Sequence, residues 1–210
     1  MSEYKNLSKQ ALKRLPMYMS YLKRIEKETE YISSSAVAVA LDLNDVQVRK
    51  DLAAVCKTAG IPKRGFLVAD LISGISDFLG YEESIDAILV GTGNLGMALM
   101  SYKGFERIGI KIAAAFDTRK ELIDNVKIFD ISKLHEMCHR LQVKIGIITV
   151  PETEAQKVCD MLVKSGIMAI WNFSPTHLKT PDEILVQNEN MSSSLAVLSN
   201  HLREKMKNNK

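Results

Sequence analysis

The sequence contains few of the residues that mark exported, membrane-bound or metal-binding chains. Among its 210 residues are one tryptophan, five prolines and three cysteines, Cys56, Cys138 and Cys159. Three cysteines cannot all pair and their spacing matches no zinc motif, so we expect reduced thiols and no metal site. No run of 18 apolar residues occurs, and the N-terminus lacks the apolar stretch of a secretory signal. These absences exclude a membrane-spanning helix and predict a cytoplasmic protein.

Excess positive charge is restricted to the first third of the chain. Residues 1–66 carry 12 Lys and Arg against 7 Asp and Glu, a balance of +5. Residues 67–210 carry 16 against 18, a balance of −2. A basic segment joined to a mildly acidic one suggests a polyanionic partner for the first segment only.

A glycine-rich turn in the middle of the chain is its most informative motif. Gly91-Thr92-Gly93-Asn94-Leu95-Gly96 lies between a predicted buried strand, residues 85–90, and a predicted helix, residues 95–103. A second predicted strand, residues 110–116, ends on Asp117. A strand, a glycine turn, a helix and an acid-tipped strand together predict a dinucleotide-binding unit.

Each part of this unit has a physical role in binding. Gly91 permits the tight turn, Gly93 lets a pyrophosphate approach the backbone, and Gly96 lets helix and strand pack closely. The phosphates would meet free N–H groups at the N-terminus of the helix. The Asp117 carboxylate can accept hydrogen bonds from both ribose hydroxyls and would repel a 2′-phosphate, so NAD(H) is favoured over NADP(H).

Strands and helices alternate through the rest of the second half. Further strands are predicted at residues 126–129, 144–150 and 168–173, and further helices at 119–124, 132–141 and 152–165. Such alternation predicts an α/β fold with a Rossmann-type parallel sheet covered on both faces. Thr149, Val150 and Pro151 follow the fourth strand, at the edge where ligands bind in open α/β sheets.

The basic N-terminal segment predicts a winged-helix domain. After a helix over residues 8–27, Ser33-Ser34-Ser35 offers a cap for a short helix, residues 36–41, and a second helix begins near Asp45. Residues 60–66 fit the tip of a basic wing, and a helix over 68–79 leads to the second module. The candidate DNA contacts are Gln47, Arg49 and Lys50 on the second helix, and Lys63 and Arg64 on the wing. A glutamine there can read adenine edges.

Two further features have competing interpretations. Apolar residues at spacings of three and four (Met191, Leu195, Leu198, Leu202, Met206) form one stripe on a C-terminal helix, which either docks on its own domain or mediates oligomerisation. His135-Glu136-Met137-Cys138-His139 matches a zinc-protease motif, but it sits on a short crossover helix with no third ligand nearby. The chain also has no substrate domain and no residue pair placed to move a proton, so we do not expect an enzyme.

The motifs together resemble one family, the Rex redox-sensing transcriptional repressors. The resemblance covers about residues 10–200 and is carried by short segments: Arg14-Leu15-Pro16 with Tyr18, Ile32-Ser33-Ser34, residues 47–52, the glycine turn, Tyr102 with Gly104-Phe105, residues 114–117, Val150-Pro151, and Asn172-Phe173 with Pro175. It departs from the family after the second helix, where residues 53–66 are about one residue longer and less aromatic.

The resemblance implies a homodimer whose C-terminal helix is swapped into the partner, and an operator that is released when NADH binds. It adds Tyr102, Asn172 and Phe173 to the cofactor site and Ser34 and Ser35 to the DNA contacts. It also implies a switch in which an aspartate at the head of the swapped helix exchanges between an arginine and a tyrosine. Here these positions are Asn190, Ser20 and Tyr102.

We therefore expect an NAD(H)-responsive repressor that binds an inverted-repeat DNA operator as a homodimer. Its expected parts are a winged-helix domain at residues 1–80, a Rossmann domain at 81–186 and a dimerisation helix at 187–210. Two alternatives remain: a Rex-like DNA-binding protein whose nucleotide is structural or weakly coupled, and a small NAD-dependent dehydrogenase.

Overall fold

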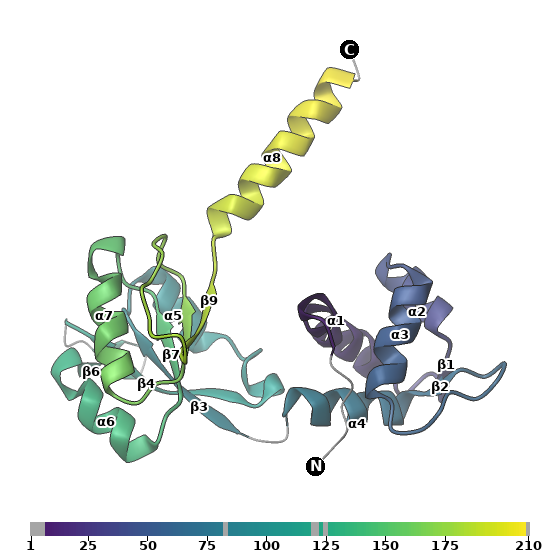
Figure 1. Ribbon diagram of the computed structural model, residues 1–210, viewed down its shortest axis with the longest axis horizontal. Helices are drawn as coiled ribbons and strands as arrows, with labels where there is room; N and C mark the ends of the chain where they lie inside the picture. Colours follow the sequence, from purple (N-terminus) through teal and green to yellow (C-terminus); the bar gives the residue numbers. More distant parts are fainter. Residues whose placement is uncertain (1–6, 82–83, 119–121, 124–125, 209–210) are drawn as a thin grey trace. The chain divides into compact units, whose positions relative to one another are not determined.

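The structure is a computed structural model that describes residues 7–81, 84–118, 122–123 and 126–208. The chain divides into two compact units, Met1–Glu83 and Ser84–Lys210, close to the boundary predicted at residue 80. Figure 1 labels most of their helices and strands. Over the described residues, no helix is long and apolar enough to cross a membrane.

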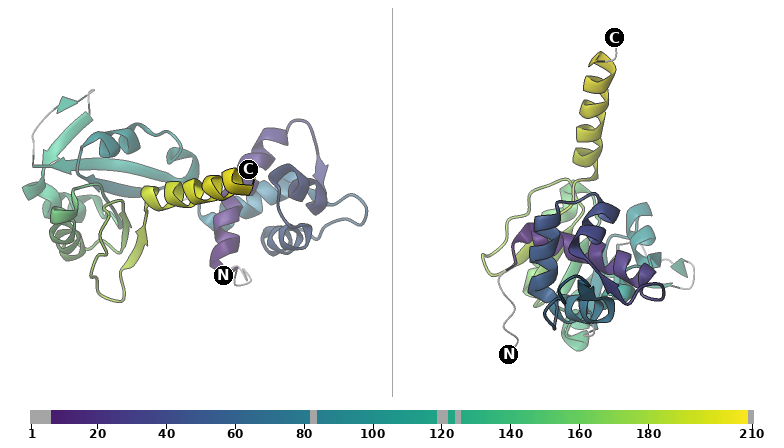
Figure 2. Two further views of the ribbon diagram at one scale, coloured as in Figure 1. Left: turned by 90° about the horizontal axis from the view of Figure 1, so that it is seen from above. Right: turned by 90° about the vertical axis from the view of Figure 1, so that its right-hand side faces the viewer.

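The first unit is a winged helix. Its elements are α1 (Lys9–Ile25), β1 (Tyr31–Ile32), α2 (Ser34–Leu41), α3 (Asp45–Val55), β2 (Phe66–Leu67) and α4 (Val68–Leu79). The Ser33 hydroxyl caps α2 by accepting from the N–H of Ala36, and the Asn44 side chain caps α3 by accepting from the N–H of Gln47. β1 and β2 pair antiparallel, and the chain between α3 and β2 forms the wing loop (Figures 1 and 2).

The helices of this unit enclose a core of their own. Leu15, Tyr18 and Leu22 recur at helical spacing on α1 and are fully buried. They pack with residues of α3 and α4, namely Val48, Leu52, Leu71 and Ile75. Pro16 lies inside α1 rather than in its first turn. The core therefore fixes α3, the second helix of the helix-turn-helix pair, against α1.

The second unit is built on one twisted sheet. Its strands are β3 (Ile85–Val90), β4 (Ile110–Asp117), β5 (Leu122–Ile123), β6 (Val126–Asp130), β7 (Ile145–Ile148), β8 (Ala169–Asn172) and β9 (Leu185–Asn188). Their order is β5-β6-β4-β3-β7-β8-β9, and every pairing except β5 with β6 is parallel. The order reverses between β3 and β7, the arrangement of a Rossmann sheet with its switch point beside β3.

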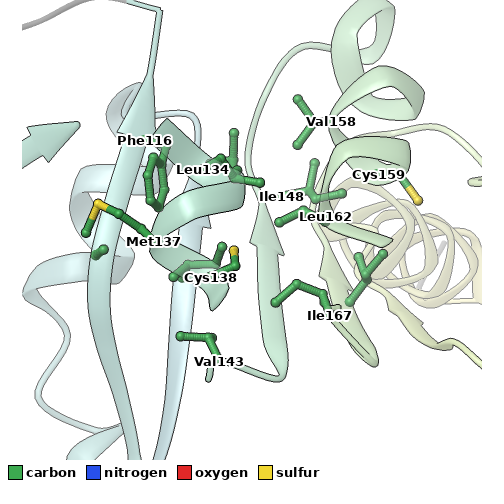
Figure 3. Close-up of a cluster of buried hydrophobic side chains, with 14 of the residues drawn as sticks. Phe116, Leu134, Met137, Cys138, Val143, Ile148, Val158, Cys159, Leu162 and Ile167 are labelled. Atoms are coloured by element: carbon green, nitrogen blue, oxygen red, sulfur yellow. The ribbon is translucent and has the colours of Figure 1, made fainter. Parts of the chain in front are cut away.

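Successive residues of the central strand face opposite layers, as a pleated strand requires. Ile88 and Val90 point to a large core formed with α6 (Leu134–Leu141) and α7 (Glu152–Lys164), which Figure 3 shows. Ala87 and Leu89 face the other side, where α5 (Asn94–Ser101) and the aromatic rings of Trp171 and Phe173 pack. The sheet is thus covered on both faces, as the alternating pattern predicted.

One predicted helix is wrong. Residues 119–124 were expected to form a helix, but Leu122–Ile123 is strand β5; residues 119–121 and 124 lie outside the described part of the chain. Leu122 and Ile123 pair antiparallel with Lys127 and Val126 of β6. Ile123 and Val126 are β-branched, which favours paired strands over a helix in so short a segment.

The end of the chain contains one strand that sequence patterns missed. β9 is short and largely exposed, so it lacks the apolar run that revealed the other strands, and it extends past the boundary predicted at residue 186. The helix α8 (Met191–Asn208) follows β9. Two short 3₁₀ turns lie earlier in this unit, at Glu106–Ile108 and Ile131–Lys133. α8 agrees closely with the predicted C-terminal helix.

Candidate nucleotide site and DNA-binding surface

The glycine turn connects β3 to α5 in a conformation that only glycine adopts easily. Gly91 has a φ of +100°, and a Cβ there would lie 2.8 Å from the carbonyl carbon of Thr149. A Cβ at Gly96 would overlap the carbonyl oxygen of Gly91, so this glycine lets the helix approach the strand. At Gly93 a Cβ would meet nothing within 4 Å. The turn is therefore packed at its two ends and open in its middle.

The open middle of the turn lies at the start of α5. Gly93 is the N-cap residue of this helix and no side chain caps it. Uncapped N–H groups at a helix N-terminus, together with the positive end of the helix dipole, favour an anion such as a phosphate. The glycine turn thus has the space and the polarity that a pyrophosphate needs.

Polar side chains of neighbouring strands hold this turn in place. Thr149, which follows β7, donates from its hydroxyl to the carbonyl oxygens of Gly91 at 2.6 Å and Val90 at 3.1 Å. Asp117, at the end of β4, accepts from the N–H and the hydroxyl of Thr92. The acid that sequence spacing placed near a ribose therefore also braces the turn.

A cavity of about 560 Å³ opens beside the turn, at the carboxyl ends of β3, β4 and β7. Its volume is within the usual range for small-molecule sites, about 300–1,000 Å³. Six predicted cofactor residues line it: Gly91, Gly93, Asp117, Thr149, Val150 and Pro151. A carboxylate, an open glycine turn and an adjoining cavity have the size and chemistry that the adenosine diphosphate half of NAD(H) requires.

Besides Val90, the last residue of β3, six other lining residues were not among the predicted cofactor residues. Thr118 and Ile131 follow β4 and β6, and Glu154, Lys157, Val158 and Met161 lie along one face of α7. The signal was available, because positions 154, 157, 158 and 161 follow helical spacing directly after the predicted ligand residues Val150 and Pro151.

The remaining predicted cofactor residues do not line this cavity. Thr92, Asn94, Leu95 and Gly96 belong to the turn and the first turn of α5. The Asn172 side chain is fully buried: its amide donates to the carbonyl oxygens of Ser174 and Thr176 and to Asn188, and its oxygen accepts from the N–H of Ser174. These bonds commit the Asn172 amide group to the loop after β8, which it shapes.

Tyr102 and Phe173 belong to an aromatic row on the α5 face of the sheet. The Tyr102 ring lies edge-on to Phe105 at 5.0 Å between centroids, Phe105 to Trp171 at 5.6 Å, and Trp171 against Phe173 at 4.5 Å. Tyr102 is 60% exposed, the most accessible of these rings. Asn190, which was predicted to belong to the switch, accepts from the N–H of Ser193 at 2.9 Å and so caps α8.

In the first unit the predicted DNA contacts are exposed on α3 and the wing. Gln47, Arg49 and Lys50 project from α3, while Val48 between them is buried. On the wing, Lys63 has a φ of +66° and the Arg64 guanidinium stacks over the Tyr31 ring at 4.2 Å. Ser35 is exposed, Ser34 donates to Asp45, and the exposed Ser20 lies on α1 beside Met17 and Tyr21.

The described residues contain no group of three or more metal-ligating side chains that could hold a metal ion. The His135 ring instead lies 3.2 Å from the Ser165 hydroxyl. Cys138 and Cys159 are buried, and burial raises the pKa of each thiol to about 11. Cys56 is half-buried, and its pKa is also raised by burial.

A winged helix with a basic exposed face, followed by a Rossmann unit with a nucleotide cavity, defines a ligand-responsive DNA-binding regulator. Two family models match these units: one described as "Putative DNA-binding protein N-terminus" over residues 6–53, and "CoA binding domain" over residues 82–176.

Curated relatives give the family. The redox-sensing transcriptional repressor Rex of Treponema denticola is 39% identical over 90% of this chain and 91% of its own length. The Rex repressor of Clostridium beijerinckii is 38% identical over 97% of this chain and 99% of its own length. The chain therefore belongs to the Rex family of redox-sensing transcriptional repressors.

Solved structures match over both units. The crystal structure of RSP in complex with β-NAD⁺ and operator DNA has a TM-score of 0.87, with 31% identity over 96% of this chain and 95% of that one. The crystal structure of RSP in complex with β-NADH has a TM-score of 0.83, with 32% identity over 98% of this chain and 100% of that one. The expected combination of a winged helix with a Rossmann-type sheet is confirmed.

Proposed function

We propose that this protein represses transcription by binding an inverted-repeat operator as a homodimer, and that NADH binding releases the operator. The observation that carries the proposal is the pairing, in one chain, of a dinucleotide cavity bounded by Asp117 with an exposed basic recognition surface. Relatives named as redox-sensing repressors, and a similar structure that holds operator DNA, support this function over a dehydrogenase.

The glycine turn and the cavity would hold NAD(H). The N–H groups at the start of α5 would bind the pyrophosphate, and Asp117 would accept from the ribose hydroxyls. The same carboxylate would repel a phosphate on that ribose, which disfavours both NADPH and coenzyme A. The nucleotide here is a signal rather than a reactant, because its role is to shift an equilibrium between two protein states.

The DNA site would be formed by α3 and the wing. Gln47, Arg49 and Lys50 would enter the major groove, and Lys63 and Arg64 would contact phosphates or the adjacent minor groove. Ser34 and Ser35, at the start of α2, would add contacts to the backbone. Two such surfaces related by a twofold axis require an inverted repeat.

The dimer would form through residues 187–210. Leu195, Leu198, Leu202 and Met206 are each more than half exposed on α8, and Val197 adds a further exposed side chain. An apolar stripe of this kind needs a partner surface, and the family resemblance gives it a second copy of the chain.

The protein would act in the cytoplasm. A DNA-bound regulator works in the compartment that holds the chromosome, and unpaired thiols suit the reducing cytoplasm.

Selection of DNA followed by nucleotide titration tests the proposal. Purified protein is used to select sequences from a random duplex library, and affinity for the selected sequence is then measured with NADH, NAD⁺, NADPH or coenzyme A. We expect an inverted repeat and a loss of affinity with NADH that the last two compounds do not cause. NADH binding without any change in DNA affinity would instead favour the weakly coupled alternative.

A further inference from the structure

A buried ion pair joins α1 to the recognition helix α3. The Asp51 carboxylate is 5% exposed, and one of its oxygens accepts from Arg14 Nε and from the Tyr18 hydroxyl, both at 2.8 Å. Arg14 and Tyr18 lie four residues apart and so share one face of α1. The Asp51 carboxylate is therefore held by two residues of α1, and its hydrogen bond with Nε fixes the direction in which the Arg14 guanidinium points.

The rest of that guanidinium faces Gln47, one turn before Asp51 on α3. With the Gln47 amide oriented to satisfy its neighbours, its oxygen accepts from Arg14 Nη1 and Nη2, both at 3.0 Å. A guanidinium has donors only, and a carbonyl oxygen has two lone pairs. Both lone pairs of the Gln47 oxygen are therefore used by Arg14, and only the amide NH₂ group remains to face outward from this exposed position.

We infer that Gln47 acts on DNA purely as a hydrogen-bond donor, and that Arg14 and Asp51 are the positioning residues that make it so. This inference rests on the proposed function. A glutamine that makes both hydrogen bonds to the major-groove edge of adenine must accept from the N6 amino group as well as donate to N7. Gln47 cannot accept, so the adenine recognition expected from its sequence position is replaced by recognition of acceptor groups.

The chemistry of the major groove then gives the base preference. Guanine presents two acceptors there and thymine presents one, whereas cytosine presents an amino donor that would face the Gln47 donor. Adenine presents one acceptor, N7, but its neighbouring N6 amino group would be left without an acceptor. We expect guanine or thymine at the contacted position. The arrangement also holds across the working pH range, because burial raises the pKa of Tyr18 to about 12 and its hydroxyl keeps donating to Asp51.

The test measures base preference at every position of the selected operator for wild type and three variants. The position that loses its preference in Gln47→Ala is the one beneath this side chain. There we expect wild type to bind guanine or thymine about three- to tenfold more tightly than cytosine, the range of one hydrogen bond. Arg14→Lys keeps a charge beside Asp51 but releases the amide oxygen, which can then accept from the N6 amino group of adenine, so the affinity for adenine should rise relative to guanine and thymine.

Gln47→Glu is the matched control, because it preserves shape and the contact with Arg14 while replacing the outward donor with an acceptor. Its melting temperature should equal or exceed that of wild type, and its preference should move to cytosine or adenine. Adenine preferred by wild type, or no position affected in Gln47→Ala, would overturn this inference alone. A protein that selects no DNA sequence would contradict the proposed function as well.

Discussion

The Asp117 carboxylate accepts two hydrogen bonds from Thr92, one from its backbone N–H at 2.7 Å and one from its hydroxyl at 2.8 Å, both on the same oxygen. The residue that ends β4 is thereby tied to the glycine turn that follows β3. Because the two strands are neighbours, this pair couples the expected ribose contact to the expected pyrophosphate contact. Loss of either partner should affect the whole adenosine diphosphate site.

Replacing Asp117 tests its place in nucleotide discrimination. Asp117→Ala should lower NADH affinity by about 1.5–3 kcal/mol for each charge-assisted hydrogen bond lost, and leave NADPH affinity unchanged or higher. Thr92→Val is the matched control, since it removes one hydrogen bond to Asp117 but retains the charge. NADH fluorescence titration measures both. Equal affinity of wild type for NADH and NADPH would show that Asp117 does not contact the ribose.

The recognition helix and the wing should respond differently to loss of a cation. Arg49→Ala should cost about 1–3 kcal/mol and relax the preference at one base pair. Lys63→Ala should weaken binding to all DNA sequences alike, and it should reduce the slope of log affinity against log salt concentration by about one. Binding measured over a salt series with operator and scrambled DNA separates these outcomes. An Arg49→Ala variant with unchanged operator affinity would contradict the assignment.

The exposed stripe on α8 should hold the dimer. Removal of residues 190–210 takes away Leu195, Leu198 and Leu202, whose burial in the dimer should contribute about 1.5–3 kcal/mol for each side chain, so the dimer should dissociate at micromolar concentration. Leu198→Asp should act in the same direction. Asn200→Asp places the same charge on the same helix away from the stripe and should have little effect. Analytical ultracentrifugation decides, and an intact truncated dimer would refute the prediction.

Neutral residues in the switch should weaken its response to NADH. The family resemblance implies that Ser20 and Asn190 replace an arginine and an aspartate. A neutral pair biases one state less than an ion pair does. The double variant Ser20→Arg with Asn190→Asp should release DNA more completely, while either change alone should not. Aspartate can keep the cap that Asn190 provides at Ser193.

The ratio of operator affinities with and without saturating NADH measures this coupling. Wild type is expected to change by less than a hundredfold, which is roughly 2.7 kcal/mol. A larger change would mean that the coupling runs through other contacts.

Burial should protect Cys138 and Cys159 from thiol reagents in the folded protein, and it should make the stability of the fold decrease at alkaline pH. Burial raises the pKa of Cys138 and Cys159 from 9.0 to about 11, so at pH 8 the folded protein holds almost no thiolate at either position. Ellman's reagent should label Cys56 first and the other two only after unfolding. The unfolded thiols ionise at lower pH than the folded ones, so stability should fall as pH rises from 9 towards 11.

Denaturation at pH 8 and pH 10.5 measures that fall, and Cys138→Ala should make it smaller. Equal labelling of all three thiols in the folded state would contradict the burial argument.

Local patterns were enough to locate most of the fold. The strand at 85–90, the turn from Gly91 to Gly96 and Asp117 are close in sequence, and each is specified by its own residue types. The β5 hairpin and β9 were missed because two-residue and four-residue strands carry too little periodicity to be distinguished from helix or loop. Their place is set by pairing with β6 and β8.

The chemical groups of this protein follow directly from its amino-acid order: a glycine turn followed by an acid, and cations on one short helix and a loop. How those groups are used depends on the packing of its helices and strands. This packing places Glu154 and Lys157 of α7 beside the glycine turn, although more than 60 residues separate them from Gly91. It also brings Arg14 into hydrogen-bonding contact with the Gln47 oxygen, so that only the donor group of this amide remains available to DNA. The reason is physical: periodicity fixes which face a residue occupies, but partners distant in sequence meet only when the helices and strands pack.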